Sequence, residues 1–398
     1  MTVLAYIVII LGILTLIQLV RVFEITGKLK GNKQNEVSDG ENSRHGMSWL
    51  IFLIAYFGFF IWLVFEYGPH MLPEAASEHG AEIDFVLNLN WAIIITAFAI
   101  THILLFVFAS KYAGGKKKKA QFVTHNNKLE LVWTTVPAIV LTVIVFYGLG
   151  AWNDITSEPA DDAVKIELYS KQFGWMARYA GEDEELGKAN YLFINGMNPL
   201  GLITENTIQT RIDELNEDIK KIEGKLEAAP KGGIKEEQLN EDLDWKIRQL
   251  RKINTYKKRH DIEPFENGTD DKIAMAGEFH LPVGKDISFI FRSQDVIHSA
   301  YMPHFRAQMN AVPGSITSFH FKPTITTEEM RRKTGNPDFD YILLCNKICG
   351  AAHYNMQMNI IVESQEDYER WLAEQKPFES VSTAEEKESS EDQKLAQK

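Results

Sequence analysis

The sequence is poor in cysteine, with only two in 398 residues. A scaffold of several disulfides is therefore excluded, because two thiols form one bridge at most. Basic residues are outnumbered as well, with 42 Lys and Arg against 54 Asp and Glu, and the formal net charge is −12. This charge argues against nucleic acid as a partner and favours a basic protein partner.

Four long stretches lack charged residues altogether. They cover residues 3–20, 49–65, 91–108 and 132–149. Each is about long enough, with its flanks, to cross roughly 30 Å of hydrocarbon as a helix. Buried core helices are the alternative, but uncharged segments of this length are typical of membrane spans. We therefore expect a membrane anchor of about four transmembrane helices.

Lysine and arginine are missing from residues 68–90, which connect the second and third apolar stretches. The first and third connections carry several, so they are predicted to be cytoplasmic. The first stretch lacks the basic start and small-residue cleavage site of a signal peptide, and we expect it to remain as an anchor. The pattern predicts a multi-pass protein of a bacterial-type cytoplasmic membrane. Everything after the fourth helix would lie on the periplasmic or outer side.

After residue 152 the pattern changes to short alternating apolar stretches, punctuated by Gly and Pro. Such stretches predict strands, and several in succession favour a β-sandwich. Residues 202–264 differ, because their apolar residues recur at steps of four and three around a Pro-Lys-Gly-Gly break. This spacing predicts an inserted antiparallel helical hairpin. The predicted strands cover residues 164–168, 191–194, 273–279, 287–291 and 315–321, and the predicted disordered polar tail covers residues 373–398.

Both cysteines lie in one short stretch, Cys345-Asn-Lys-Ile-Cys349-Gly-Ala-Ala-His353-Tyr-Asn-Met356. Thiolate, imidazole and thioether groups are soft or borderline ligands, which suit copper better than calcium or magnesium. A single blue copper needs only one cysteine, whereas two cysteines this close can bridge two copper ions. A disulfide and a zinc site are the alternatives, but neither makes use of the methionine.

We therefore predict a dinuclear copper site with one imidazole for each ion. His298 follows an alternating strand and is the candidate for the second imidazole. The thioether would cap one ion weakly, and a backbone carbonyl between the cysteines would cap the other. The predicted metal ligands are His298, Cys345, Lys347 through its carbonyl, Cys349, His353 and Met356.

The cysteine stretch resembles the CuA loop of cytochrome c oxidase subunit II. Residues 295–314, with the sequence DVIHSAYMPHFRAQMNAVPG, resemble the first-histidine segment of the same family. The resemblance covers about residues 88–372, with one insertion, and implies a cupredoxin-like fold for the sandwich. The family usually has two transmembrane helices, which the third and fourth apolar stretches resemble. The domains implied are 1–67 as extra N-terminal helices, 68–152 as the family-like hairpin and 153–372 as the CuA domain, with the insertion at about 202–264.

The resemblance also implies an activity. The chain would accept electrons from cytochrome c, or from a membrane-tethered haem c donor, and pass them to haem in the catalytic subunit I. There oxygen would be reduced while protons are pumped. Haem would belong to that partner and not to this chain, which would also contact other membrane subunits. The alternatives are a quinol-fed oxidase subunit, which lacks the copper ligands, and a membrane-anchored copper carrier or thiol–disulfide protein, which would not need His298.

Several further roles rest on the resemblance. Glu130 would feed protons into the catalytic subunit, although a charge favoured at a helix start is the alternative. Phe173 and Trp175 would lie between the electron donor and the copper. Acidic residues at 161–162 and 182–185 would steer a basic cytochrome c. Lys347 stands where the family commonly has a Glu that reaches magnesium, and an ammonium cannot bind a cation, so magnesium at the subunit junction is doubtful.

Overall fold

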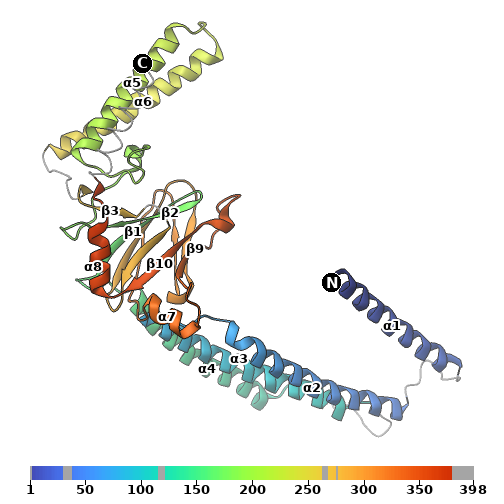
Figure 1. Ribbon diagram of the computed structural model, residues 1–398. Helices are drawn as coiled ribbons and strands as arrows, with labels where there is room; N and C mark the ends of the chain where they lie inside the picture. Colours follow the sequence, from blue (N-terminus) through green and yellow to red (C-terminus); the bar gives the residue numbers. More distant parts are fainter. Residues whose placement is uncertain (1, 30–37, 115–121, 262–267, 275–276, 379–398) are drawn as a thin grey trace. The chain divides into compact units, whose positions relative to one another are not determined.

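The computed structural model describes residues 2–29, 38–114, 122–261, 268–274 and 277–378 (Figure 1). The chain forms two compact units. One contains residues 1–72 and 89–141, and the other contains residues 73–88 and 142–398. The first unit is helical, whereas the second holds all the strands together with the start of α3 and the end of α4.

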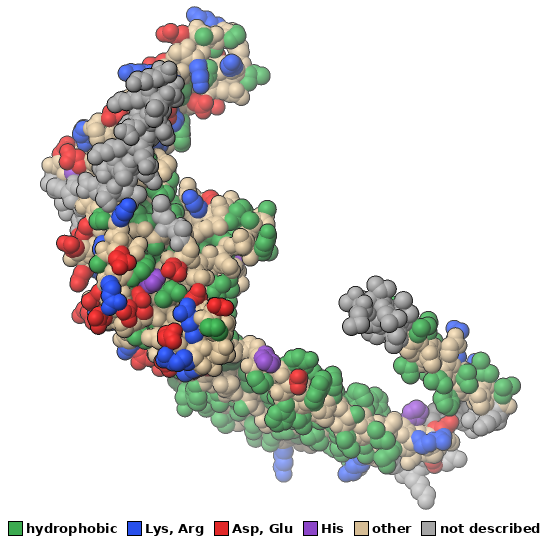
Figure 2. Space-filling view, viewed as in Figure 1, with side chains coloured by type: hydrophobic (Ala, Val, Ile, Leu, Met, Phe, Trp, Pro, Cys, Tyr) green, Lys and Arg blue, Asp and Glu red, His purple; other side chains and the backbone are tan. Residues whose placement is uncertain are grey.

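Four long apolar helices precede the strands. Each contains a segment that is long and apolar enough to cross a membrane. The surface of these four helices is mainly hydrophobic, whereas charged side chains gather over the strands and the later helices (Figure 2). The prediction of about four transmembrane helices is confirmed, and the chain is a multi-pass membrane protein with an external domain. The helices are α1 (Thr2–Leu29), α2 (Asp39–Tyr67), α3 (Glu78–Lys111) and α4 (Asn127–Ile155).

Helix α2 packs along α3 through aromatic rings. Trp49 stacks on Phe106, with ring centroids 5.5 Å apart. Nearer the start of α2, a Cβ added to Gly46 would lie 3.1 Å from the carbonyl oxygen of Ser110. A small residue there lets the two backbones approach closely, as is common where membrane helices pack. Helix α2 is thus packed into the helical anchor.

The external domain is a sandwich of two five-stranded sheets, in the strand orders β3-β2-β1-β5-β8 and β4-β10-β9-β6-β7. One face of each sheet is buried, as in β5, where Ile287, Phe289 and Phe291 are buried and alternate with partly exposed residues. The sandwich is cupredoxin-like, as predicted. The strands are β1 (Val164–Lys171), β2 (Gly174–Tyr179), β3 (Lys272–Ala274), β4 (Glu278–Pro282), β5 (Ile287–Ser293), β6 (His298–Met302), β7 (Ala307–Ala311), β8 (Thr317–Phe321), β9 (Tyr341–Cys345) and β10 (Gln357–Glu363), and the short helices α7 (Thr327–Thr334) and α8 (Gln365–Glu374) complete the domain.

Residues 73–88 pack as part of this external domain, although the sequence prediction assigned all of 68–152 to the transmembrane hairpin. Ala76 is fully buried in the core of the sandwich, and its amide donates to the carbonyl of His304 at 2.7 Å. Arg306 binds both carboxylate oxygens of Asp84, at 2.8 and 2.9 Å. These contacts join residues more than 200 positions apart, which no local pattern in the sequence reveals.

The inserted helical hairpin is present as predicted. It consists of α5 (Glu205–Glu227) and α6 (Ile234–His260). The hydroxyl of Thr204 caps α5 by accepting the amide of Thr207. At the base of the hairpin, Leu215 and Ile253 are fully buried and belong to a cluster with Phe193. This cluster is separate from the core of the sandwich.

Two predicted strands have a different structure. Residues 191–194 form a 3-10 turn, η2 (Tyr191–Phe193), because the side chain of Asn190 caps the amide of Leu192. Residues 273–279 were predicted as one strand but contribute to two, β3 and β4, which belong to opposite sheets. Residues 275 and 276 between them lie outside the described residues.

The predicted polar tail begins too early. Helix α8 extends to Glu374, and Phe378 is buried, with its amide donating to the carbonyl of Asp271 at 2.9 Å. Burial of one aromatic ring holds this short segment against the sandwich. Residues 379–398, where the disordered tail was also predicted, lie outside the described residues.

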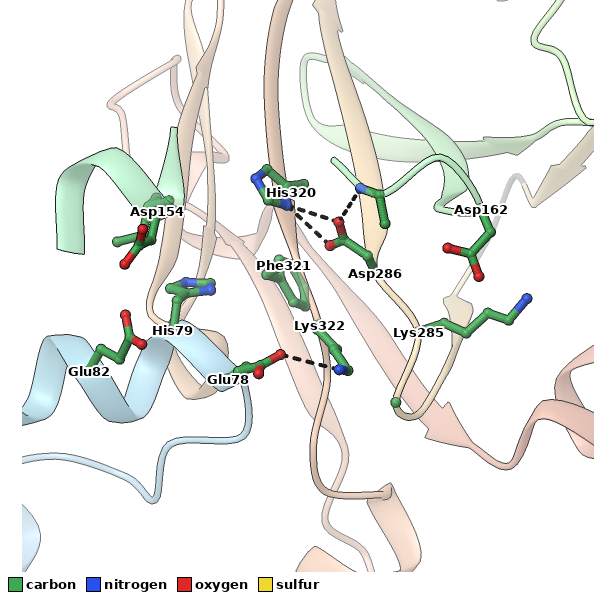
Figure 3. Close-up of a pocket in the computed structure, with 13 residues that line it drawn as sticks. Glu78, His79, Glu82, Asp154, Asp162, Lys285, Asp286, His320, Phe321 and Lys322 are labelled. Atoms are coloured by element: carbon green, nitrogen blue, oxygen red, sulfur yellow. Dashed lines mark hydrogen bonds and ion pairs between the residues drawn. The ribbon is translucent and has the colours of Figure 1, made fainter. Parts of the chain in front are cut away.

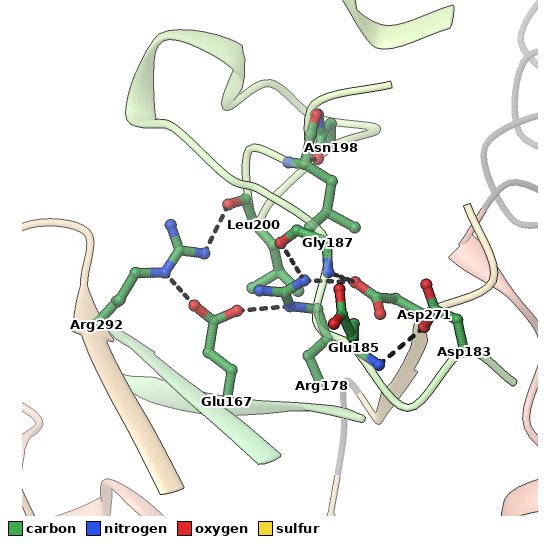
Figure 4. A network of polar contacts seen from close by, with 10 residues as sticks. Glu167, Arg178, Asp183, Glu185, Gly187, Asn198, Leu200, Asp271 and Arg292 are labelled. Carbon is green, nitrogen blue, oxygen red and sulfur yellow. Dashed lines mark hydrogen bonds and ion pairs between the residues drawn. The ribbon is translucent and has the colours of Figure 1, made fainter. Parts of the chain in front are cut away.

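A network of buried charges ties the segment before the hairpin to the first sheet (Figure 4). Glu167 of β1 binds Arg178 at 2.6 Å and also binds Arg292. Arg178 in turn pairs with Asp271 and donates to the carbonyl of Gly187 at 2.9 Å. Each buried charge therefore has a partner of opposite sign, which buried charges need.

Candidate metal centre

Strands β6 and β9 bring the predicted ligands together. They are paired antiparallel, with Ala300 opposite Cys345. This register places His298, at the start of β6, beside Cys345, at the end of β9. The loop that follows Cys345 folds back, and the amide of Cys345 donates to the carbonyl of Met356 at 3.0 Å. All six predicted ligands therefore lie at one end of the sandwich.

The other ligand atoms gather around the two sulfurs. The Sγ atoms of Cys345 and Cys349 are 3.9 Å apart. On the Cys345 side, its Sγ lies 3.8 Å from Nδ1 of His298 and 3.2 Å from the carbonyl oxygen of Lys347. The Cys345 sulfur thus has one imidazole nitrogen and one weak donor, the carbonyl oxygen, within 4 Å.

The Cys349 side mirrors this arrangement. Its Sγ lies 3.6 Å from Nδ1 of His353 and 3.8 Å from Sδ of Met356. The thioether is buried, as is the sulfur beside it. Met356 therefore faces the cysteine pair and does not simply fill the core.

Both cysteines are free thiols. Their separation of 3.9 Å far exceeds the roughly 2.05 Å of an S–S bond, so the disulfide alternative is not realised here. A metal–thiolate bond is about 2.3 Å long, and two such bonds to one ion span a sulfur separation of this size. The thiolates are thus spaced to share an ion between them.

Three of the donors form a compact group within the part of the chain that the structure describes. One ligand atom from each of His298, Cys345 and Cys349 lies within 4.8 Å of the others. His353 does not belong to this group and approaches the sulfurs from the Cys349 side. One tetrahedral ion could be held by the compact group, but it would leave His353 and Met356 unused.

Asp295 orients His298. The Nε2 of His298 is 2.9 Å from a carboxylate oxygen of Asp295, so the proton on this nitrogen leaves Nδ1 free to face Cys345. Burial opposes ionisation of Asp295, but hydrogen bonds from His298 and from the amides of Gln172 and Val296 hold the pKa of this carboxyl below its usual value. No role was predicted for Asp295, although its position three residues before His298 is evident in the sequence.

The environment of Cys349 keeps its thiol protonated when no metal is bound. Burial, together with the neighbouring Cys345, raises the pKa of the Cys349 thiol to about 11. A thiolate is the form that binds metal, so loading of the site must displace this proton.

Gln172 and Gly350 hold the cysteine loop in place. The side-chain amide of Gln172 donates to the carbonyl of Cys349. Gly350 has a φ of +146°, and a Cβ at this position would lie 2.8 Å from Gln172 and 2.9 Å from the ring of Phe173. Only glycine fits such a conformation with such close neighbours. Sequence reasoning missed both residues, because the contact joins positions 177 apart.

The aromatic residues predicted to lie on the electron path differ in exposure. Trp175 is 4% exposed and packs beneath His298, with ring centroids 6.1 Å apart. Phe173 is 38% exposed and lies against the cysteine loop. The surface aromatic is therefore Phe173, and Trp175 is a buried neighbour of the ligand.

Glu130, predicted for proton uptake, lies in the first turn of α4. Its carboxylate accepts the amide of Asn126 at 3.4 Å, and the Asn126 side chain accepts the amide of Leu129 at 3.1 Å. These bonds satisfy amides at the helix start, which is the structural alternative that the sequence left open.

The acidic stretches lie away from the cysteine loop. Strands β1 and β2 pair so that Lys171 faces Gly174 at the end nearest Gln172, whereas Ile166 faces Tyr179 at the other end. Residues 161–162 precede β1 and residues 182–185 follow β2, so both stretches lie at that far end. At about 3.3 Å per residue, the length of β1 separates them from the loop by roughly 20 Å.

Together, the fold and the site define a class of protein: a membrane-anchored, cupredoxin-like protein with a group of soft ligands that could hold a metal. Two family models match the chain. Residues 50–150 match the transmembrane domain of cytochrome c oxidase subunit II, and residues 255–365 match its periplasmic domain. The chain belongs to the cytochrome c oxidase subunit II family and is thus a subunit of an oxidase complex.

Known relatives agree with this assignment. The alternative cytochrome c oxidase subunit 2 of Bradyrhizobium diazoefficiens is 29% identical over 304 residues, which cover 75% of this chain and 82% of that protein. Cytochrome c oxidase subunit 2 of Thermostichus vulcanus is 24% identical, covering 78% of this chain and 79% of that one. The protein of the same name from Cereibacter sphaeroides is 25% identical, covering 76% and 78%.

Among solved structures, the periplasmic domain of subunit II of cytochrome oxidase from Bradyrhizobium japonicum matches with 15% identity and a TM-score of 0.26. The match covers 54% of this chain and 94% of that one. The family assignment rests on the sequence matches and not on this superposition.

Proposed function

We propose that this chain is the electron-accepting subunit of a respiratory cytochrome c oxidase. Electrons would arrive from cytochrome c, or from a tethered haem c donor, at a dinuclear CuA centre. They would then pass to haem in the catalytic subunit, where oxygen is reduced and protons are pumped. The observation that carries this proposal is a pair of unbonded sulfurs 3.9 Å apart, with one imidazole nitrogen within 4 Å of each.

The donor set fits two copper ions better than one. The two cysteine sulfurs would bridge both ions. Beside each sulfur lie one imidazole nitrogen and one weak donor, so each ion could have both. Copper bound there would supply reversible one-electron chemistry. The six residues that would hold it are His298, Cys345, Lys347 through its carbonyl, Cys349, His353 and Met356.

The surrounding residues prepare the site for this chemistry. Asp295 fixes the ring of His298 so that Nδ1 points at the sulfur. Gln172 anchors the backbone between the second cysteine and the second imidazole. Such outer contacts hold the ligands in one geometry, so little rearrangement would accompany a change of charge.

An apolar surface around the cysteine loop would receive the electron donor. Ile348 is 87% exposed and Tyr354 is 86% exposed, and Phe173 and Ile297 are exposed beside them. The loop that projects beyond β9 in Figure 1 carries hydrophobic side chains in Figure 2. Exposed apolar patches of this kind mark interaction sites. The acidic stretches at the far end of β1 and β2 would contribute less to docking than the sequence predicted.

The remaining assignments complete the proposal. Residues 1–67 would be helices added to the family pattern, and the membrane would be the cytoplasmic membrane of a bacterium. Catalytic subunit I and other membrane subunits would surround the anchor, while nucleic acid would not be a partner. Glu130 would supply protons to the catalytic subunit, and magnesium at the junction would not involve the side chain of Lys347.

Metal analysis of the full-length chain tests the proposal. We expect two copper ions per chain after reconstitution, and fewer in His298→Ala, because one ion would lose its only imidazole. A copper carrier or thiol–disulfide protein would tolerate that change. One tightly bound copper or zinc per chain, insensitive to His353→Ala, would overturn the dinuclear site.

A further inference from the structure

A polar cavity lies beside the start of α3 and the end of α4, apart from the cysteine site (Figure 3). Its volume is about 540 Å³, and all its lining residues belong to the unit that contains the strands. Five carboxylates line it, against two ammonium groups and two imidazoles. This excess of negative charge favours a cationic ligand.

His320 of β8 is arranged as metal-binding histidines usually are. Its Nδ1 lies 3.1 Å from both carboxylate oxygens of Asp286, which also accepts the amide of Ala160 at 2.9 Å. The other nitrogen, Nε2, is buried and has no hydrogen-bond partner among the described residues. A carboxylate behind one ring nitrogen fixes the tautomer and leaves the other as a ligand.

His79 supplies a second imidazole of the same kind. Its Nε2 is also buried without a partner in the described part of the chain. The ring packs against Phe319 and Phe321, with centroids 5.6 and 6.2 Å away. These contacts hold the ring while leaving one nitrogen without a hydrogen bond, which is costly unless a ligand binds there.

Two exposed carboxylates face this part of the cavity (Figure 3). Glu82 lies three residues after His79 on α3, so the two share one face of the helix. Asp154 comes from the last turns of α4. Both also border a neighbouring, largely apolar cavity between these helices, where low polarity strengthens attraction to a cation.

We propose that this cavity binds a divalent transition metal ion, such as zinc, through His79, Glu82, Asp154 and His320. Nitrogen and oxygen donors without sulfur suit zinc, whereas the cysteine site suits copper. The four donors lie apart in the ion-free chain, since only the cysteine cluster brings three such atoms within 4.8 Å among the described residues. Glu82 and Asp154 are exposed, and rotation of their side chains would close the site. The bound ion would clip α3 and α4 to β8.

Cobalt and zinc binding to the full-length chain tests this site. Two forms are used, the copper-loaded chain and the chain with Cys345→Ser and Cys349→Ser, so the result does not depend on copper at the cysteines. We expect one cobalt ion to bind in both forms, with the weak visible bands of nitrogen and oxygen ligation. Thiolate charge-transfer bands should be absent, and zinc should displace the cobalt.

Variants with matched charge identify the ligands. Glu82→Gln and Asp154→Asn should each weaken zinc binding by at least the roughly tenfold that loss of a residue supporting a ligand causes. Asp162→Asn removes a charge from the same cavity without removing a proposed ligand, and it should have little effect. His79→Ala should abolish zinc binding. If that variant does not fold, the Glu82→Gln and Asp154→Asn variants still test the site, because both positions are exposed.

Three results would overturn the inference. They are the absence of cobalt binding, thiolate bands in the copper-loaded chain, and an effect of Asp162→Asn as large as that of Glu82→Gln. The last result would mean that the acidic surface gathers cations without a defined site.

Discussion

At the scale of single residues, we expect the proposed metal centre to depend on side chains that do not themselves bind metal. Asp295 is one of them, because it accepts a hydrogen bond from His298 and two from backbone amides. Asp295→Ala should lower copper affinity by about 10- to 100-fold, as loss of such an orienting partner does. Asp295→Asn keeps one acceptor oxygen, so its copper affinity should lie between those of the unaltered chain and Asp295→Ala. Copper competition titrations measure the effect.

The control for this prediction is Asp338→Asn, which changes an exposed carboxyl outside the metal centre. Its copper affinity should match that of the unaltered chain. If Asp295→Ala also bound copper normally, the orienting role would be wrong.

Gly350 gives a second residue-scale prediction. In Gly350→Ala, the new Cβ would meet Gln172 and Phe173 at under 3.0 Å, so the cysteine loop must shift. We expect an altered copper absorption spectrum. Gly314→Ala is the matched control, because Gly314 also has a positive φ but no atom lies within 4 Å of its added Cβ. It should lower stability modestly, by about 1 kcal/mol, and leave the spectrum unchanged. Identical spectra for the two variants would contradict the prediction.

The metal ligands could be predicted from the sequence, but the residues that hold them in place could not. Cys345, Cys349, His353 and Met356 share one short motif, so their chemistry could be read locally. The orienting role of Asp295 needed the ring geometry of His298. The role of Gln172 arises only when β1 and the cysteine loop are folded together. Residue types and local spacing were therefore predictable from the sequence, whereas side-chain orientation and the contact of Gln172 with the loop were not.

At the scale of secondary-structure elements, the hairpin and the sandwich have separate cores. Leu215 belongs to the hairpin cluster, and Leu343 of β9 belongs to the cluster that contains both cysteines. Both are fully buried, so Leu→Ala at either should cost about 2–5 kcal/mol locally. Only Leu343→Ala should disturb the copper spectrum, and replacing residues 204–260 with a short linker should leave copper loading intact. Loss of copper in Leu215→Ala would show that the two cores are coupled.

The charge network behind β1 and β2 gives a pH prediction. Burial raises the pKa of Asp271 to about 6, because Arg178 is shared with Glu167 and compensates only in part. A raised pKa means that the folded state holds this proton more tightly than the unfolded state does. The contribution of Asp271 to stability is therefore present at low pH and declines as the pH rises to about 6.

Asp271→Asn removes this dependence. Between pH 4 and pH 7 the unaltered chain should lose up to about 3 kcal/mol of unfolding free energy relative to the variant, since one pKa unit corresponds to about 1.4 kcal/mol. Urea unfolding followed by tryptophan fluorescence measures the difference at each pH. If the unfolding free energies of the unaltered chain and Asp271→Asn changed in parallel with pH, the raised pKa of Asp271 would be contradicted.

Element patterns predicted the helices more accurately than the strand boundaries. Four uncharged stretches and the heptad spacing were enough to predict α1 to α6, because the backbone hydrogen bonds of a helix join residues close in sequence. The segment at 191–194 looked like a strand but is held as a turn by Asn190. Residues 73–88 lie between two apolar stretches, yet their core contacts come from β6 to β8, far along the chain.

At the scale of the whole molecule, charge is distributed unevenly between the two ends of the sandwich. The acidic stretches lie at the end opposite the cysteine loop, and the loop itself exposes Ile348 and Tyr354. We therefore expect the rate of electron transfer from a soluble donor to fall only weakly with ionic strength. Ile348→Glu should slow the reaction at high salt, because an exposed apolar contact is lost. It should also make the rate depend on salt, because it adds a charge to the docking surface.

Stopped-flow measurements between low and high salt, with Glu184→Gln as the control, test this expectation. A steep fall with salt in the unaltered chain that Glu184→Gln reduces would favour steering by the acidic stretches. In that case the apolar surface would not be the main docking site.

The central claim is that two metal ions share the pair of sulfurs between β9 and β10. Electron paramagnetic resonance of the copper-loaded, full-length chain tests it most directly. We predict one unpaired electron divided equally between two copper nuclei, with a hyperfine pattern that collapses in Cys349→Ser. A spectrum from an electron confined to a single copper nucleus would contradict the claim.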